Sequence, residues 1–342
     1  MSPIDDPVQS ALESFLPLIP RGPLGGEKAA LLAARGRVLA VDVAAVMDDP
    51  PYARSIMEGY VVPASEAAAA SNERPVVLQV VGEIPVGIGE AKGIGPGKAL
   101  RVTTGSYIPP GDYAVVKQWD VLQEEGKIRL TKPVRPNENI ETQGADRKKG
   151  TALFKQGHRL TSADLFVLAG QGILEVTVSK RPRVALFSSG NEVIPPTEPF
   201  RVGAIWDCNQ YGLSALVEEA GGVPIFKGIV KDDFTLFSAR MKESLAEVDL
   251  VLISGGTAIG GKDFTVDLVN AAGAPGAVVK GVPMRSGKPI VLGVSGVKPI
   301  VCVAGHPPEA ARGFTLFGRP ALGRLLGETA EIEPKKTGAQ AG

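Results

Sequence analysis

The sequence predicts an α/β protein: a doubly wound, mostly parallel sheet in the second half, a small all-β insertion domain in the first half, and a helical linker domain around that insertion. Two observations predict this organisation. From Arg183 onward, short apolar runs alternate with segments whose apolar residues recur at helical spacing, as in a buried parallel sheet covered by helices. Between residues 48 and 139, short β-prone runs are instead separated by Gly/Pro turns, which is typical of an all-β domain.

The helical linker domain is predicted from residues 1–47 and 140–180, on both sides of the insertion. Its predicted elements are helices over 7–18, 27–34 and 161–171 and an extended segment over 37–46. Thr161 and Ser162 are both suitable N-cap residues for the last of these helices, because a hydroxyl oxygen can accept a hydrogen bond from the first turn.

The insertion domain and the α/β domain are predicted over residues 48–139 and 181–327. In the insertion, β-prone runs occupy 75–81, 114–117 and 127–130. In the α/β domain, strands are predicted over 184–187, 224–230, 249–254 and 299–303, with helices over 210–220, 234–246 and 308–326. The remaining residues, 328–342, are predicted to form a polar tail.

The composition argues against several classes of partner. The 342 residues include 37 Lys plus Arg and 37 Asp plus Glu, which gives no electrostatic reason to expect nucleic acid or an anionic membrane as the main partner. No uninterrupted apolar run approaches the roughly 20 residues that span a bilayer. The N-terminus lacks the early basic cluster of a signal peptide, and two cysteines are too few for a disulfide framework. We therefore expect a reducing, cytoplasmic setting.

Three turns rich in glycine and small hydroxyl residues follow predicted strands, at 188–192, 253–263 and 304–308. Parallel strands end at one edge of their sheet, so these turns are expected to lie together, where their backbone N–H groups can approach a phosphate. Turn geometry alone explains any single one of them; three at one edge indicate a site. The predicted ligand-binding residues are Ser188, Gly190, Ser254, Gly255, Gly256, Thr257, Gly305 and Pro307.

Three acidic residues fall near these turns in the predicted pattern: Glu192, Asp232 and Asp263. Carboxylates beside phosphates are what Mg²⁺ prefers, so the three are predicted to hold Mg²⁺.

The sequence lacks the residues that several other kinds of active site require. The sequence has no Gly-x-x-x-x-Gly-Lys-Ser/Thr segment and no Gly-x-Ser-x-Gly segment, which disfavours a P-loop NTPase and an α/β-hydrolase. Of the two histidines, His158 is predicted to be a solvated turn residue, whereas His306 stands at a strand-end turn where ligand binding and turn chemistry are both open. A Ser-His-Asp triad cannot be assembled from them.

Six segments, spread over residues 10–327, together resemble the MoeA-type molybdenum insertases and the homologous E domain of gephyrin. Ser-Ser-Gly-Asn-Glu at 188–192 is similar to the family's Ser-Thr-Gly-Asp-Glu, and Ser-Gly-Gly at 254–256 begins a segment similar to its Ser-Gly-Gly-Val-Ser-x-Gly-x-x-Asp. The remaining segments that carry the likeness are 51–60, 101–105, 144–146 and 287–289.

The resemblance implies that the α/β domain binds molybdopterin and that the reaction inserts molybdate into adenylylated molybdopterin with Mg²⁺, releasing AMP. It implies catalytic roles for Glu58, Thr104, Asp146, Glu192 and Lys288, with Arg285 helping Lys288 to attract molybdate. It also implies a homodimer, with a site shared between one subunit's α/β domain and the other's β insertion, and other cofactor-biosynthesis proteins as partners.

The sequence departs from the family pattern at several of these positions. Glu58 and Asn191 stand where the family has Asp, and the family's Pro-Gly-Asn-Pro-Val-Ser turn reads Ala-Gly-His-Pro-Pro-Glu over 304–309. A carboxylate at Glu309 would repel molybdate by about 1–4 kcal/mol at a few Å. The family's last domain, a β-barrel, is not expected after Gly327. These departures leave open an insertase, a non-catalytic paralogue that carries or senses molybdopterin, and a scaffold that keeps only the interface.

Overall fold

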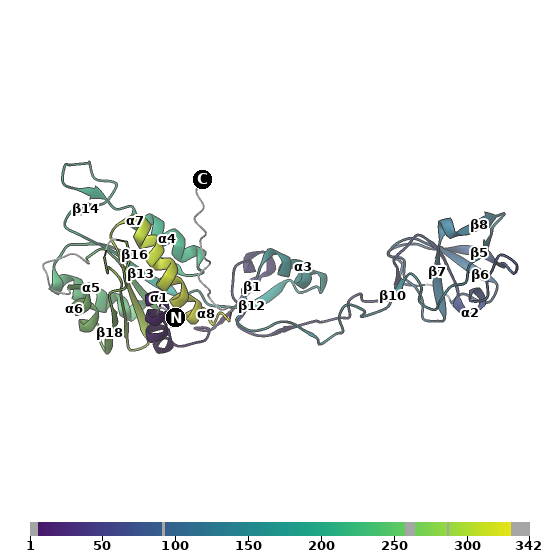
Figure 1. Ribbon diagram of the computed structural model, residues 1–342, viewed down its shortest axis with the longest axis horizontal. Helices are drawn as coiled ribbons and strands as arrows, with labels where there is room; N and C mark the ends of the chain where they lie inside the picture. The colour runs from purple at the N-terminus through teal and green to yellow at the C-terminus, as the bar shows by residue number, and fades with distance from the viewer. Residues whose placement is uncertain (1–5, 91–92, 257–263, 286, 330–342) are drawn as a thin grey trace, which may run out of the picture. The chain divides into compact units, whose positions relative to one another are not determined.

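The computed structural model describes residues 6–90, 93–256, 264–285 and 287–329 (Figure 1). The chain divides into an α/β unit of residues 1–42, 154–169 and 174–342 and a β unit of residues 43–153 and 170–173. Each unit contains one six-stranded sheet. The segments predicted to form a helical linker domain are thus divided between the two units. None of the described helices is both long and apolar enough to span a membrane.

The sheet of the α/β unit has the strand order β16-β13-β17-β20-β19-β18. Its strands are β13 (Arg183–Ser189), β16 (Val223–Val230), β17 (Leu250–Ser254), β18 (Pro275–Lys280), β19 (Val291–Ser295) and β20 (Lys298–Val303). The first four strands in this order pair in parallel, as predicted, and β19 pairs antiparallel with both of its neighbours. β18 and β19 are the two strands that the sequence patterns did not indicate.

Helices cover both faces of this sheet, which confirms the doubly wound fold (Figure 1). The helices on one face are α1 (Pro7–Phe15), α4 (Asn209–Glu219), α7 (Pro307–Gly313) and α8 (Arg319–Leu326), and those on the other are α5 (Phe234–Glu247) and α6 (Phe264–Ala271). The side chains of β13 point alternately to the two faces of the sheet and so contribute to a hydrophobic core on each. Val184 and Leu186 pack against the first group of helices, and Ala185 and Phe187 pack against the second.

The helix predicted over 308–326 is interrupted. A π-helical turn, Phe314–Gly318, separates α7 from α8. Pro320 lies at the start of α8 and has no N–H to donate to the carbonyl four residues earlier, so a regular α-helical ladder cannot run through this point.

The prediction of a helix over residues 27–34 is wrong. Residues Gly26–Ala30 form strand β1, which pairs antiparallel with β12 (Glu175–Ser179), and only Leu31–Ala34 turn, as a 3₁₀ helix. Pairing with β12 satisfies the backbone of this segment and outweighs the modest helix preference of its Ala, Leu and Lys residues.

The predicted helix over 161–171 is confirmed as α3 (Ser162–Gly170), and Thr161 caps it. The Thr161 hydroxyl accepts a hydrogen bond from the Asp164 N–H at 3.4 Å, and the Asp164 carboxylate accepts one from the Thr161 N–H at 2.7 Å. This reciprocal pair satisfies two donors of the first turn.

In the part of the β unit between residues 43 and 153 that the structure describes, strands predominate, with the short helix α2 (Ala64–Ala67) and a 3₁₀ turn at Gln118–Asp120. Its sheet has the order β7-β4-β6-β5-β9-β8, formed by β4 (Gly59–Pro63), β5 (Val76–Ile84), β6 (Lys98–Val102), β7 (Tyr113–Lys117), β8 (Val121–Glu124) and β9 (Lys127–Leu130). The runs predicted over 75–81, 114–117 and 127–130 are confirmed as β5, β7 and β9. Two further pairs of strands form separate two-stranded sheets, β3 (Arg54–Ser55) with β10 (Ile140–Glu141) and β2 (Val43–Ala44) with β11 (Ala152–Phe154).

Candidate functional site

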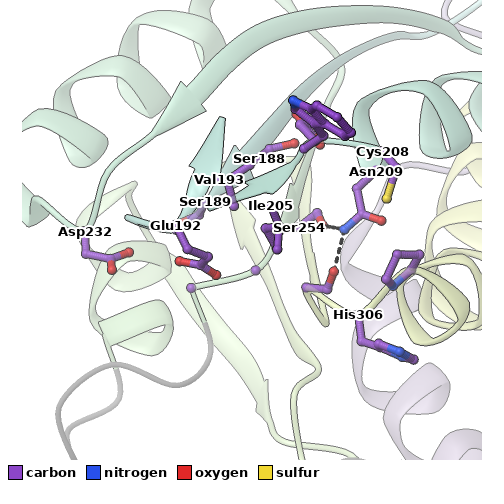
Figure 2. Close-up of a pocket in the computed structure, with 17 residues that line it drawn as sticks. Ser188, Ser189, Glu192, Val193, Ile205, Cys208, Asn209, Asp232, Ser254 and His306 are labelled. Carbon is purple, nitrogen blue, oxygen red and sulfur yellow. Dashed lines mark hydrogen bonds between the residues drawn. The ribbon is translucent and has the colours of Figure 1, made fainter. Parts of the chain in front are cut away.

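A pocket of about 500 Å³ opens at the carboxyl ends of β13, β17 and β20 (Figure 2). It brings together Asp232, which follows β16, and predicted residues from all three turns: Ser188, Gly190, Glu192, Ser254, Gly255, Gly256, Gly305 and Pro307. The other lining residues are Ser189, Val193, Ile205, Trp206, Asp207, Cys208, Asn209 and His306. The strand-end turns therefore meet at one edge of the sheet, where doubly wound proteins commonly bind ligands.

Asn209, at the start of α4, ties two of these turns together. Its side-chain amide donates to the Ser254 hydroxyl at 2.6 Å and to the Gly305 carbonyl at 2.7 Å, the two bonds drawn as dashed lines in Figure 2. One side chain thus fixes the end of β17 against the turn that follows β20.

Gly255 lets two turns approach closely. Its φ is +92°, and a Cβ atom added there would collide with the Ser189 carbonyl oxygen. Its N–H, however, donates to the Val303 carbonyl at 3.1 Å, and the Gly190 N–H donates to the Val230 carbonyl at 3.3 Å. These two N–H groups therefore bond to protein acceptors, which weakens the expectation that they hold a phosphate.

Polar atoms without partners concentrate in this pocket. The Ser188 and Ser189 hydroxyls, Asp207 Oδ2 and Asp232 Oδ1 are buried, and none has a hydrogen-bond partner within the described protein. A buried polar group left unpaired costs about 1–3 kcal/mol. Four such groups around one pocket indicate a polar ligand that pairs with them; the fifth such atom among the described residues, Arg129 Nε, belongs to the β unit.

Two carboxylates form an acidic end of the pocket. Burial and, second, the negative charge of Glu192 raise the pKa of Asp232 above its ordinary value. The Glu192 carboxylate bends back over Gly190, where an added Cβ would lie 2.7 Å from Oε2. A divalent cation here would relieve the repulsion and pair with Asp232 Oδ1, so these two residues fit Mg²⁺.

The third predicted Mg²⁺ ligand, Asp263, lies outside the described residues, as does Thr257. Across residues 6–256 and 264–329, apart from the short gaps, no three or more His, Cys, Asp or Glu side chains gather as a metal site. Two of the three predicted ligands are thus brought to one pocket.

Lys231 holds the turn that carries Glu192. Its ammonium group donates to the carbonyls of Val193 at 2.8 Å and Asn191 at 3.1 Å. The Asn191 side chain in turn accepts from the Asp232 N–H at 3.3 Å. Asn191, where the resembling family has Asp, therefore links the two segments that carry the acidic pair.

The predicted cations Arg285 and Lys288 do not line the pocket, and both are exposed on the connection between β18 and β19. Strand register nevertheless places that connection at the same sheet edge, because Lys280 pairs with Val291 and Val291 pairs with Cys302 near the end of β20.

Glu309 has a different environment from the one expected. It is 8% exposed, in the first turn of α7, and is not among the described residues that line the pocket. The structure therefore gives no support to the expected repulsion of molybdate by this carboxylate.

The predicted residues of the β unit, Glu58, Thr104 and Asp146, are all exposed. Glu58 precedes β4 and Thr104 follows β6, and these loops are neighbours because Gly59 pairs with Val102. Asp146 lies in another segment of the unit, where its N–H donates to the Asp49 carbonyl at 2.9 Å.

Sequence patterns missed Trp206, Asp207, Asn209 and Lys231. The available indication was local: Asp207-Cys-Asn209 stands just before a predicted helix, where Asp and Asn are typical capping residues. That position explains a helix cap but not the unpaired carboxylate oxygen of Asp207, which depends on the long-range packing of the segment that follows β15 (Ile205–Trp206).

Comparison with known proteins identifies the family. Residues 5–172 match the model of the MoeA N-terminal region (domain I and II), and residues 185–324 match that of a probable molybdopterin binding domain. A molybdopterin molybdenumtransferase from Nostoc sp. is 34% identical over 89% of this chain and 70% of its own length. The chain belongs to the MoeA family.

Other members extend the comparison. The molybdopterin molybdenumtransferase of Bacillus subtilis is 32% identical over 86% of this MoeA-family chain and 69% of the relative. A crystal structure of a molybdopterin biosynthesis MoeA protein from Pyrococcus horikoshii OT3 aligns with a TM-score of 0.82 at 31% identity, covering 95% of this chain and 80% of that one.

Proposed function

We propose that this MoeA-family protein acts in molybdenum cofactor biosynthesis by inserting molybdate into adenylylated molybdopterin, with Mg²⁺ and release of AMP. The observation that carries the proposal is the pocket, which places the Glu192–Asp232 pair beside buried serine hydroxyls that have no partner among the described residues. Relatives over 30% identical bear the name molybdopterin molybdenumtransferase, which supports the same reaction.

The protein's own groups suit a ligand with phosphates. The Ser188 and Ser189 hydroxyls have no partner among the described residues and can donate hydrogen bonds to phosphate oxygens. Glu192 and Asp232 would hold Mg²⁺, which would neutralise charge on the pyrophosphate when bound. Asn209 keeps the surrounding turns in place through its two side-chain hydrogen bonds.

A molybdopterin-binding paralogue without catalysis is the alternative. Several departures from the family pattern suggest it, among them the changed turn at 304–309. The carboxylate in that turn that was expected to repel molybdate, Glu309, does not line the described pocket. Insertion is therefore the better-supported function. A homodimer in the cytoplasm remains our expectation for its assembly and location.

The direct test is AMP release from adenylylated molybdopterin with Mg²⁺ and molybdate. The wild type should release AMP, and Glu192→Gln should release it at least about tenfold more slowly, because one carboxylate of the cation site is lost. Glu243→Gln, an exposed change on α5 outside the pocket, is the matched control and should behave as wild type. Equal rates for Glu192→Gln and wild type would refute the assigned site, and no release by the wild type would refute the function.

A further inference from the structure

We propose that Trp206 and Asp207 form a recognition subsite for the pterin ring of the ligand. The Trp206 indole covers a face of the ring, and the Asp207 carboxylate accepts hydrogen bonds from the N–H groups on its edge. This inference rests on the proposed function for the presence of a pterin, and it assigns which end of the pocket holds that ring.

Asp207 is a buried carboxylate with one oxygen used and one unused. It stands between β15 and α4, is 3% exposed and lines the pocket. Its Oδ1 accepts from the Gln210 N–H at 3.1 Å, in the first turn of α4, whereas Oδ2 has no partner among the described residues. Helix capping accounts for the first oxygen and leaves the second available to a ligand donor.

The hydrogen-bonding character of Asp207 selects between the two rings of adenylylated molybdopterin. An ionised carboxylate only accepts hydrogen bonds. The amino-oxo pyrimidine edge of a pterin presents a ring N–H next to an exocyclic amino group, which are two adjacent donors. The corresponding edge of adenine presents an amino donor next to a ring nitrogen acceptor, which a carboxylate would repel. Asp207 therefore favours the pterin, by the same logic with which carboxylates read base edges.

Trp206 supplies an oriented aromatic surface at the same place. Its indole N–H donates to the Glu198 carbonyl at 3.0 Å, and its ring packs edge-on against Phe200, with centroids 5.5 Å apart. These contacts fix the ring, yet the side chain lines the pocket and the residue stays 48% exposed. An indole ring whose orientation is fixed by such contacts, and which is still exposed to the pocket, is suited to stacking on a flat heterocycle.

The pocket separates this subsite from the acidic end. Figure 2 shows Asp232 at one end and Cys208 and Asn209, the residues that follow Asp207, at the other, with Ser188, Ser189 and Ser254 between them. A ligand with a ring in the subsite would thus extend its phosphates across the serines toward Glu192 and Asp232.

Asp207→Asn is the sharpest variant. Asparagine keeps the oxygen that caps Gln210 and replaces Oδ2 with an amino donor, which opposes the donor edge of a pterin but not adenine. By calorimetric titration, affinity for hydroxymethylpterin should fall about tenfold or more, while affinity for AMP should be unchanged or higher. Equal losses for both probes, or no loss for the pterin, would overturn the proposal.

Asp233→Asn is the matched control for this variant. Asp233 caps α5 through the same kind of bond, accepting from the Leu236 N–H at 2.9 Å, but it does not line the pocket. Affinity for hydroxymethylpterin should be unchanged in this variant, so a loss in both variants would mean that helix capping, not ring recognition, is responsible.

Fluorine NMR of fluorotryptophan-labelled protein tests Trp206 separately. The chain has two tryptophans, so Trp119→Phe assigns the Trp206 signal. Hydroxymethylpterin should shift that signal, adenosine should shift it less, and Trp206→Leu should weaken pterin binding about tenfold, whereas Trp206→Phe should retain most of it. A Trp206 signal that does not respond to the pterin would contradict the proposal.

Turnover distinguishes this proposal from the proposed function. In the AMP-release assay, Trp206→Leu should raise KM with little change in kcat, because the residue touches the ring and not the reacting phosphate. If the wild type releases AMP and KM is unchanged in this variant, the subsite is wrong while the function stands. If the wild type releases no AMP but pterin binding depends on Asp207, the function is wrong while the subsite stands.

Discussion

At Asp232, burial and the Glu192 carboxylate both favour the protonated acid. Because its pKa in the folded protein is raised above the ordinary value of 3.8, this group stabilises the fold below that value, and the contribution is lost as pH rises through the raised pKa. Asp232→Asn removes this dependence. In Mg²⁺-free buffer at neutral pH, the variant should be more stable than wild type by up to about 1 kcal/mol, a small figure because solvent screens a half-buried group.

With Mg²⁺ present, the wild type should become more stable than Asp232→Asn. Millimolar Mg²⁺ should raise the Tm of the wild type by binding the folded state, and should raise the Tm of Asp232→Asn much less. Thermal unfolding with and without Mg²⁺ across the acidic to neutral range measures both effects. An identical Mg²⁺ shift in the two proteins would remove Asp232 from the cation site.

Gly305 offers a change that narrows the pocket without straining the backbone. A Cβ there would lie 3.4 Å from the Gly255 Cα, an ordinary contact, whereas a Cβ at Gly255 would collide with Ser189. We expect Gly305→Ala to unfold within about 1 kcal/mol of wild type and to bind AMP more weakly, and Gly255→Ala to lose about 1–3 kcal/mol of stability. Urea unfolding would measure the stability of both variants, and calorimetric titration would measure their AMP affinity. Normal AMP affinity in Gly305→Ala would mean that the phosphate binds elsewhere.

Residue types and order predicted most of the pocket, but not its unpaired atoms. Ser188, Glu192, Asp232 and the glycines after β17 could be named because strand-end position is visible in the apolar pattern. Asp207 could not, since its free oxygen depends on long-range packing around β15. Glu309 is an error of the opposite kind, a residue that was expected in the site and does not line it. Its neighbours in sequence suggested a place in the pocket, but it is buried in the first turn of α7 and is not among the lining residues.

At the scale of elements, the turn between β13 and β14 (Val193–Ile194) depends on Lys231. That ammonium group binds backbone carbonyls on both sides of Glu192, and charged hydrogen bonds of this kind contribute about 1.5–3 kcal/mol. Lys231→Met should therefore lower the free energy of unfolding by about 1–3 kcal/mol and reduce kcat for AMP release more than it raises KM, because Glu192 is displaced.

Lys227→Met is the matched control for the turn. Lys227 lies on β16, the strand that ends just before Lys231, and pairs with Glu247 at 2.8 Å, away from the pocket. Loss of this ion pair in Lys227→Met should lower the free energy of unfolding by less than about 1 kcal/mol and leave the rate of AMP release unchanged. If both variants lose turnover equally, the effect arises from β16 as a whole and not from the turn.

Local pattern decided some elements and tertiary pairing decided others. Residues 184–187 and 249–254 are apolar enough to be strands in any packed context, and both are strands in the sheet. Residues 27–34 have mild helix preferences, and a strand partner far along the chain overrides them, as the register of Lys28 with Thr177 shows. The segments that form β18 and β19 are rich in Gly and Val. Their apolar residues do not recur at a spacing that would distinguish a strand from a loop.

At the scale of the molecule, the family resemblance implies a homodimer with sites that draw residues from both subunits. Two inactive variants, Asp232→Ala in the α/β unit and Glu58→Ala in the β unit, should then complement each other. Unfolded and refolded as an equal mixture, they should recover about a quarter of wild-type AMP release, because half of the dimers would carry one intact site. Light scattering would report the dimer directly. A monomer, or a dimer without recovery, would contradict the shared site.

The most direct test of the central claim is to count molybdenum and AMP in the same reaction. Wild-type protein is mixed with adenylylated molybdopterin, Mg²⁺ and molybdate, and the AMP released and the molybdenum bound to the pterin are measured together. Insertion predicts equimolar amounts of the two, and both should form at least about tenfold more slowly in Glu192→Gln. AMP release without molybdenum on the pterin, or bound molybdopterin with no AMP release, would contradict it.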